Sequence, residues 1–150
     1  MNYKYRSIAI LALFLTILDL TAKWLAQKYL TAPLELWPGF LQLKLSYNPG
    51  IAFSIPVPNL AMIIATPFLL VALLYGIRHA CNMRHTISKI SVALIVAGGI
   101  GNFINRIWTG AVIDFLDFSF WPSFNLADAY LTIGAFLLII FYGKIKLKNS

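Results

Sequence analysis

The sequence predicts an all-α membrane protein with four transmembrane helices, both termini in the cytoplasm and a small extracytoplasmic β-sheet on the membrane surface. Composition is the first observation behind this prediction, because 60% of the 150 residues are hydrophobic, whereas soluble domains are usually about half apolar. Arrangement is the second, because the apolar residues form long runs, as membrane spans require. No repeat, low-complexity tract or linker interrupts the chain, which indicates one membrane-embedded domain over residues 1–150.

The net charge of +7 is the third observation. Such a charge could indicate nucleic-acid binding, but the basic residues lie at the ends of the apolar runs and form no continuous stripe. Membrane topology explains them, because cytoplasmic loops carry an excess of Lys and Arg, and no nucleic-acid partner is expected. Three basic groups therefore mark the cytoplasmic side: Lys4 and Arg6; Arg78, Arg84 and Lys89; and Lys144, Lys146 and Lys148.

The first apolar run extends from about residue 7 to residue 30. A basic start with an apolar middle also fits a signal peptide. However, the run contains Asp19 and Lys23 and lacks a clear small-x-small cleavage site, so an uncleaved first helix is expected. Asp19 and Lys23 are four residues apart and share one face of a helix. Their pairing either only neutralises buried charge or supports a nearby site.

The segment from residue 31 to residue 59 contains five prolines, which exclude a spanning helix. Within it, Leu41–Tyr47 alternates apolar and polar residues, the period of a half-buried strand. Asn48-Pro49-Gly50 signals a turn, and Ile51–Ile55 is a candidate second strand, so we expect a small sheet on the membrane surface. The alternative is a plain loop anchored by aromatic residues in the interface: Trp37, Phe40, Tyr47 and Phe53.

Three further helices are expected, over Leu60–Ile77, Ile87–Ile107 and Leu126–Tyr142, with residues 109–124 outside the membrane. Closely spaced glycines in the third helix would allow neighbouring helices to approach closely: Gly98, Gly99 and Gly101.

The polar loop over residues 78–85 contains two histidines and the chain's single cysteine, Cys81. The spacing matches no familiar zinc pattern and no carboxylate is nearby, so no metal site is expected there. One cysteine allows no internal disulfide.

Polar side chains of three predicted helices lie at a similar depth. With a helix rise of about 1.5 Å per residue, Asp19 and Asn102 lie about 20 Å from the cytoplasmic ends of their helices, and Arg106 and Asp128 about 25 Å. The hydrocarbon core is about 30 Å thick, so these groups form a layer just beneath the outer surface. Ionisable groups are costly there, which favours a functional site. A transporter site is more often near the midplane, whereas a shallow site suits a substrate ending at the outer interface.

Asp114 and Asp128 are the candidate catalytic pair, because two neighbouring carboxyls share a proton. One can then activate water while the other donates to a carbonyl oxygen. Neither a Ser/His/Asp set nor an HExxH motif is present, so hydrolysis would have to use carboxylates. Asp128 could instead only cap a helix, because Asn125 precedes it by three residues. Asp117 is expected to be a solvated or sheet-edge residue, facing away from Asp114 in a strand.

Five motifs resemble the lipoprotein signal peptidase (signal peptidase II) family, and the resemblance covers nearly the whole chain. Each motif is weak alone, but five in order, on helices of the expected topology, are specific. They are Asp19-Leu20-Thr21-Ala22-Lys23, Asn48-Pro49-Gly50-Ile51-Ala52-Phe53, Gly98-Gly99-Ile100-Gly101-Asn102 with Arg106, Val112-Ile113-Asp114-Phe115, and Phe124-Asn125-Leu126-Ala127-Asp128.

The resemblance implies an aspartic endopeptidase of the bacterial inner (cytoplasmic) membrane, with its site near the extracytoplasmic face. The family removes signal peptides from prolipoproteins, cutting before a diacylglyceryl-modified cysteine, without metal or cofactor. Membrane lipid and globomycin-type inhibitors are the other partners it implies. Carried over by motif, the roles are catalytic for Asp114 and Asp128, substrate-binding for Asn48, Asn102, Arg106 and Asn125, and supporting for Asp19 and Lys23.

The chain departs from the family pattern immediately before the motif arginine. The family has Asp at this place, whereas this sequence has Asn105 before Arg106. If the family Asp only orients the arginine, Asn can still accept a hydrogen bond. The departure therefore concerns how Arg106 is oriented more than the catalytic step.

Two other functions remain open from the residues alone. A small transporter or channel subunit could use Asp114, Asp117 and Asp128 as a cation path, and it would need charge on all three. A Mg²⁺-dependent lipid phosphotransferase is suggested by Asp114-x-x-Asp117, because hard cations bind carboxylate clusters. That enzyme would lose activity in EDTA, whereas aspartic hydrolysis needs no metal.

Overall fold

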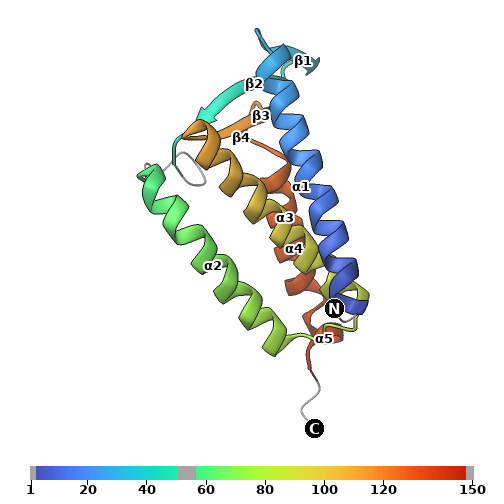
Figure 1. Cartoon of the computed structure of the whole chain (residues 1–150). Helices are drawn as coiled ribbons and strands as arrows, with labels where there is room; N and C mark the ends of the chain where they lie inside the picture. The colour runs from blue at the N-terminus through green and yellow to red at the C-terminus, as the bar shows by residue number, and fades with distance from the viewer. Residues whose placement is uncertain (1–2, 51–56, 148–150) are drawn as a thin grey trace.

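The computed structural model describes residues 3–50 and 57–147. Its helices run side by side, and the strands form a sheet at one end, far from both termini (Figure 1). The helices are α1 (Tyr3–Tyr29), α2 (Asn59–Ala80), α3 (Thr86–Thr109), α4 (Leu126–Ile140) and the short α5 (Tyr142–Ile145). The strands are β1 (Leu34–Trp37), β2 (Leu41–Asn48), β3 (Val112–Phe118) and β4 (Trp121–Phe124).

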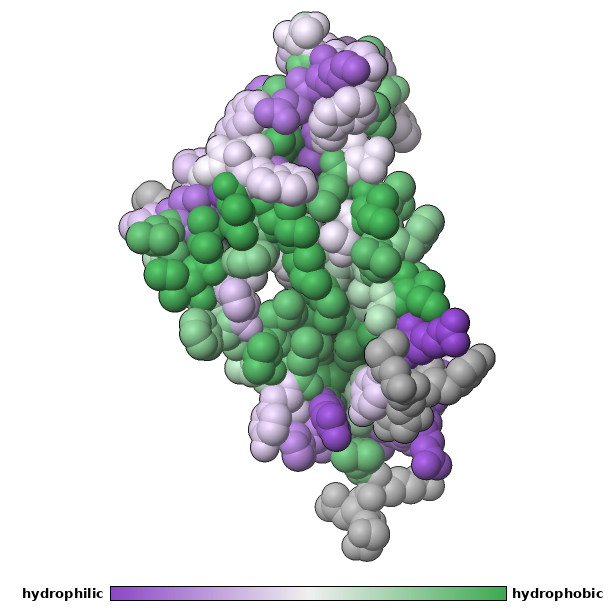
Figure 2. All heavy atoms as spheres, in the orientation of Figure 1, coloured by the Kyte–Doolittle hydropathy of each residue, from purple (hydrophilic) through white to green (hydrophobic). Residues whose placement is uncertain are grey.

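Helices α1, α2 and α3 are long and apolar enough to cross a membrane, and they are the three that qualify within the described residues. Helix α4 is apolar but has only 15 residues, fewer than the roughly 20 that span a bilayer. It ends at Ile140 rather than at Tyr142, the expected end. On the face that Figure 2 shows, a hydrophobic belt crosses the helices, with hydrophilic surface at both ends. These features are those of a multi-pass membrane protein.

The sheet is antiparallel with the order β1-β2-β3-β4. The predicted strand over Leu41–Tyr47 is confirmed as β2, and β3 is one of its partners. The expected partner, Ile51–Ile55, lies outside the described residues. Residues 109–124, expected only to leave the membrane, contain β3 and β4. The first four residues of β3 are all buried, so its sequence lacks the alternation of a half-buried strand.

Helix α3 is central, because it packs against α1, α2 and α4. The predicted packing role of its glycines is confirmed by close approaches on two sides. A Cβ on Gly98 would lie 2.4 Å from the Ala127 carbonyl oxygen of α4, and a Cβ on Gly101 would lie 2.5 Å from Asp19 Oδ2 of α1. The absence of side chains there lets α1 and α4 bring polar groups onto α3.

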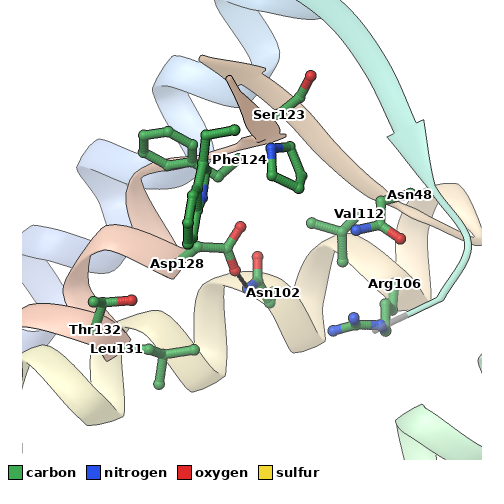
Figure 3. A pocket seen from close by; sticks show the side chains of 11 residues that line it. Asn48, Asn102, Arg106, Val112, Ser123, Phe124, Asp128, Leu131 and Thr132 are labelled. Carbon is green, nitrogen blue, oxygen red and sulfur yellow. Dashed lines mark hydrogen bonds between the residues drawn. The ribbon is translucent and has the colours of Figure 1, made fainter. Parts of the chain in front are cut away.

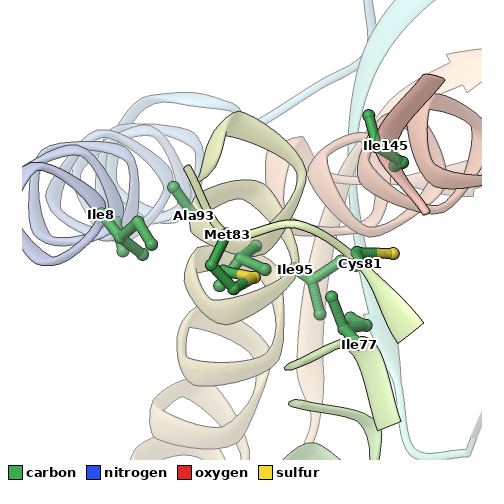
Figure 4. Close-up of a cluster of buried hydrophobic side chains, with 9 residues drawn as sticks. Ile8, Ile77, Cys81, Met83, Ala93, Ile95 and Ile145 are labelled. Atoms are coloured by element: carbon green, nitrogen blue, oxygen red, sulfur yellow. The ribbon is translucent and has the colours of Figure 1, made fainter. Parts of the chain in front are cut away.

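The apolar core lies at the end of the bundle opposite the sheet. Figure 4 shows Ile8 of α1, Ile77 of α2, Ile95 of α3 and Ile145 of α5 around it, and all four are buried. The sheet end contains buried polar residues instead, so the two ends of the bundle differ in chemistry. The cluster comprises Ile8, Ala12, Ile77, Cys81, Met83, Val92, Ala93, Ile95 and Ile145.

Candidate active site

The start of α4 places Asp128. Asn125 is the N-cap, its side-chain oxygen accepting a hydrogen bond from the Asp128 backbone N at 3.0 Å. In return, Asp128 Oδ2 accepts one from the Asn125 backbone N at 3.3 Å. The predicted capping box is therefore confirmed. Asp128 does more than cap, because its Oδ1 accepts a hydrogen bond from Asn102 Nδ2 of α3 at 2.7 Å.

The second aspartate, Asp114, lies on β3 and is 2% exposed. Its Oδ1 accepts a hydrogen bond from Asn125 Nδ2 at 2.7 Å. Its Oδ2 accepts one from Asn48 Nδ2, at the end of β2, at 3.2 Å. Asn125 therefore contacts both aspartates, Asp114 through its side chain and Asp128 through its backbone and side chain. This residue brings a strand carboxyl and a helix carboxyl into one site.

The pKa of Asp114 is raised to about 6, first by burial and then by the negative charge of Asp128. The amide donors Asn125 and Asn48 oppose this rise, because they stabilise the ionised form. Asp114 can therefore hold a proton beside the carboxyl of Asp128 at a higher pH than an ordinary aspartic acid does.

The Asp19–Lys23 pair of α1 contacts residues beside Asp128. Lys23 Nζ lies 2.8 Å from Asp19 Oδ2 and donates to Asn102 Oδ1 at 2.8 Å. Because Asn102 accepts at its oxygen, its amide nitrogen is the end that donates to Asp128. Asp19 Oδ1 accepts a hydrogen bond from the Ala127 backbone N at 2.9 Å. The pair therefore contacts α3 and α4 beside Asp128, beyond neutralising its own charge.

A pocket of about 350 Å³ opens beside these groups. In Figure 3, Asp128 and Asn102 are joined by a hydrogen bond, and Asn48 and Arg106 lie across the pocket from Asp128. Among the described residues, the pocket lining does not include Asp114, which is buried beneath Asn48 and Asn125. The lining residues are Asn48, Asn102, Arg106, Val112, Trp121, Pro122, Ser123, Phe124, Asp128, Leu131 and Thr132.

Arg106 reaches the pocket from the last turn of α3 and is 8% exposed. Its Nη2 donates to the Gly50 carbonyl oxygen at 3.0 Å, so it holds the chain just after β2. Its backbone carbonyl oxygen accepts a hydrogen bond from Asn59 Nδ2 of α2 at 3.3 Å. The arginine therefore supplies the pocket with a buried positive charge opposite Asp128.

Asn105, which stands in place of the family Asp, does accept a hydrogen bond. The donor is the backbone N of Ile113, at 2.6 Å, rather than the neighbouring arginine. Asn105 is 4% exposed and therefore ties the end of α3 to β3, one residue before Asp114. Asn105 therefore holds β3, the strand of the buried Asp114, rather than Arg106. This pairing between residues 105 and 113 could not be read from the motif.

Of the two alternatives expected for Asp117, the sheet edge is wrong, whereas the solvated residue is met in part, because its side chain is half-buried. It is on the inner strand β3, where it accepts hydrogen bonds from Gln42 Nε2 of β2 and Ser123 Oγ of β4. The hydrogen bond from Ser123 is the main cause that lowers the pKa of Asp117. Asp114 is bonded instead by Asn48 and Asn125, so the two aspartates do not share partners.

Within the described part of the chain, no group of three or more His, Cys, Asp or Glu side chains is placed to hold a metal ion. The wall that β4 contributes to the pocket is the part of the site that sequence reasoning missed. No local signal in Trp121–Phe124 indicates that wall, because it depends on the pairing of β4 with β3.

Comparisons with known proteins point to one family. The family model described as signal peptidase (SPase) II matches residues 11–143. A lipoprotein signal peptidase of Aquifex aeolicus is 39% identical, covering 97% of this chain and 90% of its own. One from Symbiobacterium thermophilum is 33% identical, covering 94% of this chain and 97% of its own.

Two solved structures, each described as a bacterial membrane enzyme, are also similar to this chain. One has a TM-score of 0.78 at 31% identity and covers 91% of this chain and 87% of its own. The other has a TM-score of 0.74 at 31% identity and covers 95% of this chain and 94% of its own. The matching family model and relatives, over nearly the full length, show that this chain belongs to the signal peptidase II family.

Proposed function

We propose that this chain is an intramembrane aspartic endopeptidase that removes signal peptides from prolipoproteins, cutting before the diacylglyceryl-modified cysteine. The observation that supports this best is the coupling of Asp114 and Asp128 through Asn125 beside the pocket. The family supplies the substrate class, because its members are lipoprotein signal peptidases.

In the mechanism that we propose, Asp114 and Asp128 share one proton. The ionised carboxylate takes a proton from water, whose oxygen attacks the scissile carbonyl carbon. The protonated carboxyl donates its proton to the carbonyl oxygen, which gives a neutral tetrahedral diol. Collapse of this intermediate breaks the C–N bond: the carboxyl that took a proton from water gives it to the leaving amine, and the other carboxylate accepts a proton from a diol hydroxyl, which leaves a carboxylic acid. Asp128 borders the pocket, so the buried Asp114 would have to be uncovered for both to reach the substrate.

The other polar groups hold the pair and the substrate. Asn102 and Asn125 donate to the aspartates, and the buried Asp19–Lys23 pair fixes Asn102 in the orientation that this needs. Asn48 and Arg106 line the pocket, where an amide and a guanidinium can bind substrate carbonyl oxygens. We assign Asn48, Asn102, Arg106 and Asn125 to substrate binding and Asp19 and Lys23 to support.

We propose one membrane-embedded domain over residues 1–150 with α4 as a fourth span. A 15-residue helix covers about 22 Å, and α4 begins beneath the sheet rather than at the membrane surface. The positive residues at both ends and in the loop before α3 favour cytoplasmic termini. The sheet and the aspartates would then lie near the extracytoplasmic face of the bacterial inner membrane.

The geometry favours this function over its two rivals. A cation path through Asp114, Asp117 and Asp128 would need the three groups to share a route, but Asp117 is bonded on the sheet to Gln42 and Ser123. The same separation disfavours a Mg²⁺ site on Asp114 and Asp117, because a hard cation needs both carboxylates on one face.

Cleavage of a defined substrate tests the proposed function. The purified protein in detergent should cut a diacylglyceryl-modified prolipoprotein and release a fragment with the lipidated cysteine at its N-terminus. The same prolipoprotein without the lipid is the matched control and should be cut far more slowly. Mass spectrometry of the products gives the cut site. Globomycin-type cyclic peptides should compete with the substrate, and a cut elsewhere, or none, would contradict the proposal.

A further inference from the structure

Strand β4 forms one wall of the pocket, although it is weakly held by its own backbone. All four of its residues line the pocket: Trp121, Pro122, Ser123 and Phe124. It is an edge strand and pairs with β3 at two positions, Leu116 with Phe124 and Phe118 with Trp121. Pro122 has no N–H to donate to the ladder. Contacts beyond the ladder therefore help to hold the wall, and one of them is the stacking of the Phe124 ring on Phe118 of β3.

In the register of β3 with β4, Asp117 lies opposite the irregular part of β4. Between the two paired positions, the single residue Asp117 of β3 faces both Pro122 and Ser123 of β4, which is the count of a β-bulge. Asp117 Oδ1 accepts a hydrogen bond from Ser123 Oγ at 2.7 Å. In Figure 3 the Ser123 hydroxyl points away from Asp128. This side-chain bond takes the place of the ladder bonds that the bulge removes.

The other oxygen of Asp117 holds the neighbouring strand. Its Oδ2 accepts a hydrogen bond from Gln42 Nε2 at 2.5 Å, and Gln42 lies directly opposite Asp117 in the β2–β3 register. Strand β2 ends at Asn48, which also lines the pocket. One carboxylate thus joins the two strands that supply parts of the pocket wall. Ionised carboxylates make stronger hydrogen bonds than neutral acceptors.

We propose that Asp117 is a positioning residue for substrate binding, which holds β4 through Ser123 and β2 through Gln42 so that the pocket fits the prolipoprotein segment beside the scissile bond. This inference rests on the proposed function and deepens it. Asp117 does not touch the reacting atoms. Its loss should therefore weaken substrate binding and leave the chemical step nearly intact.

The test separates KM from kcat with a lipidated prolipoprotein as the substrate. Asp117→Ala and Ser123→Ala should each raise KM about tenfold, the scale of one lost hydrogen bond to a charged group, with kcat within about twofold of wild type. The double variant should be no worse than Asp117→Ala, because that variant already lacks the contact that Ser123→Ala removes. Ser123→Thr retains a hydroxyl, so its KM should stay close to that of wild type.

Glu35→Gln is the matched control, because it removes an exposed carboxylate from β1 of the same sheet and should not change KM. Binding of the labelled substrate to each variant in an Asp128→Asn background gives affinity without turnover. If wild type neither binds nor cuts the substrate, the proposed function and this inference both fail. If wild type cuts but Asp117→Ala and Ser123→Ala bind like wild type, or lose kcat instead, only this inference is overturned.

Discussion

The amide group of Asn125 determines how the two carboxyls meet. Its nitrogen donates to Asp114 and its oxygen accepts from the backbone of Asp128. Asp or Leu at this position would lack the donor that Asp114 needs, although Asp would still cap the helix. The residue therefore serves two requirements at once, the start of α4 and the environment of the buried aspartate.

Protonation of Asp114 should make stability depend on pH. Its pKa in the folded chain is raised from 3.8 to about 6 by burial and by Asp128, so the folded state binds the proton more tightly than the unfolded state. The free energy of unfolding should therefore fall as pH rises from about 4 to about 6, by on the order of 3 kcal/mol. Thermal unfolding of wild type and Asp114→Asn across this range checks it, because the variant should lack this part of the decline.

The same titration should appear in catalysis. A pair that works with one shared proton loses activity when the second carboxyl ionises, so kcat/KM should fall as pH rises above the raised pKa of Asp114, about 6. Asn48→Ala removes a donor that stabilises the ionised form of Asp114, so the fall in kcat/KM should move to higher pH. If kcat/KM of Asn48→Ala falls at the same pH as that of wild type, the assigned hydrogen bond between Asn48 and Asp114 is contradicted.

Removal of Lys23 should be costly, because it leaves the carboxylate of Asp19 buried without its partner. Breaking one side of a buried pair costs about 3–5 kcal/mol, and Asn102 would also lose one of its two donors, keeping the one from Asn125. Lys23→Met should lower the unfolding temperature strongly. Lys28→Met is the matched control on the same helix, because Lys28 is exposed over the Trp24 ring, and it should change little.

At the scale of elements, the glycines of α3 set the distance to α1. Gly101→Ala should push α1 away, because its Cβ would lie 2.5 Å from Asp19 Oδ2, whereas nothing lies within 4 Å of a Cβ on Gly76 in α2. Activity and unfolding temperature should therefore fall in Gly101→Ala. Gly76→Ala should be neutral or stabilising by up to about 1 kcal/mol, because alanine favours the helix. Equal effects from the two substitutions would contradict this packing.

The strands show how far the sequence could predict the site. The alternation of Leu41–Tyr47 identified β2, although its burial does not alternate, because its residues are half-buried except for the exposed Lys44 and Tyr47. Strand β3 is covered over its first half and shows no such period. The contacts of Asp117 depend on Gln42, far away in the chain, and on a bulge in β4. Local sequence patterns do not contain such pairings, so the contacts of Asp117 could not be predicted. The capping pattern of Asn125 and Asp128 is local and could be.

At the scale of the whole molecule, the charged ends and the hydrophobic belt imply a defined orientation (Figure 2). With Cys81 replaced by Ser, single cysteines at Glu35 on β1 and at Arg84 in the loop before α3 should lie on opposite sides of the membrane. Both positions are exposed. A membrane-impermeant maleimide should label the first in intact spheroplasts and the second only after lysis. Labelling of both before lysis would contradict the assigned topology.

The central claim is that Asp114 and Asp128 together carry out the hydrolysis. The most direct measurement is cleavage of a diacylglyceryl-modified prolipoprotein in detergent with EDTA present, for wild type, Asp114→Asn, Asp128→Asn and the control Glu35→Gln. Wild type and Glu35→Gln should cut equally well, and each aspartate variant should lose at least about a hundredfold in rate. Substantial cleavage by either aspartate variant, or loss of wild-type activity in EDTA, would contradict the account.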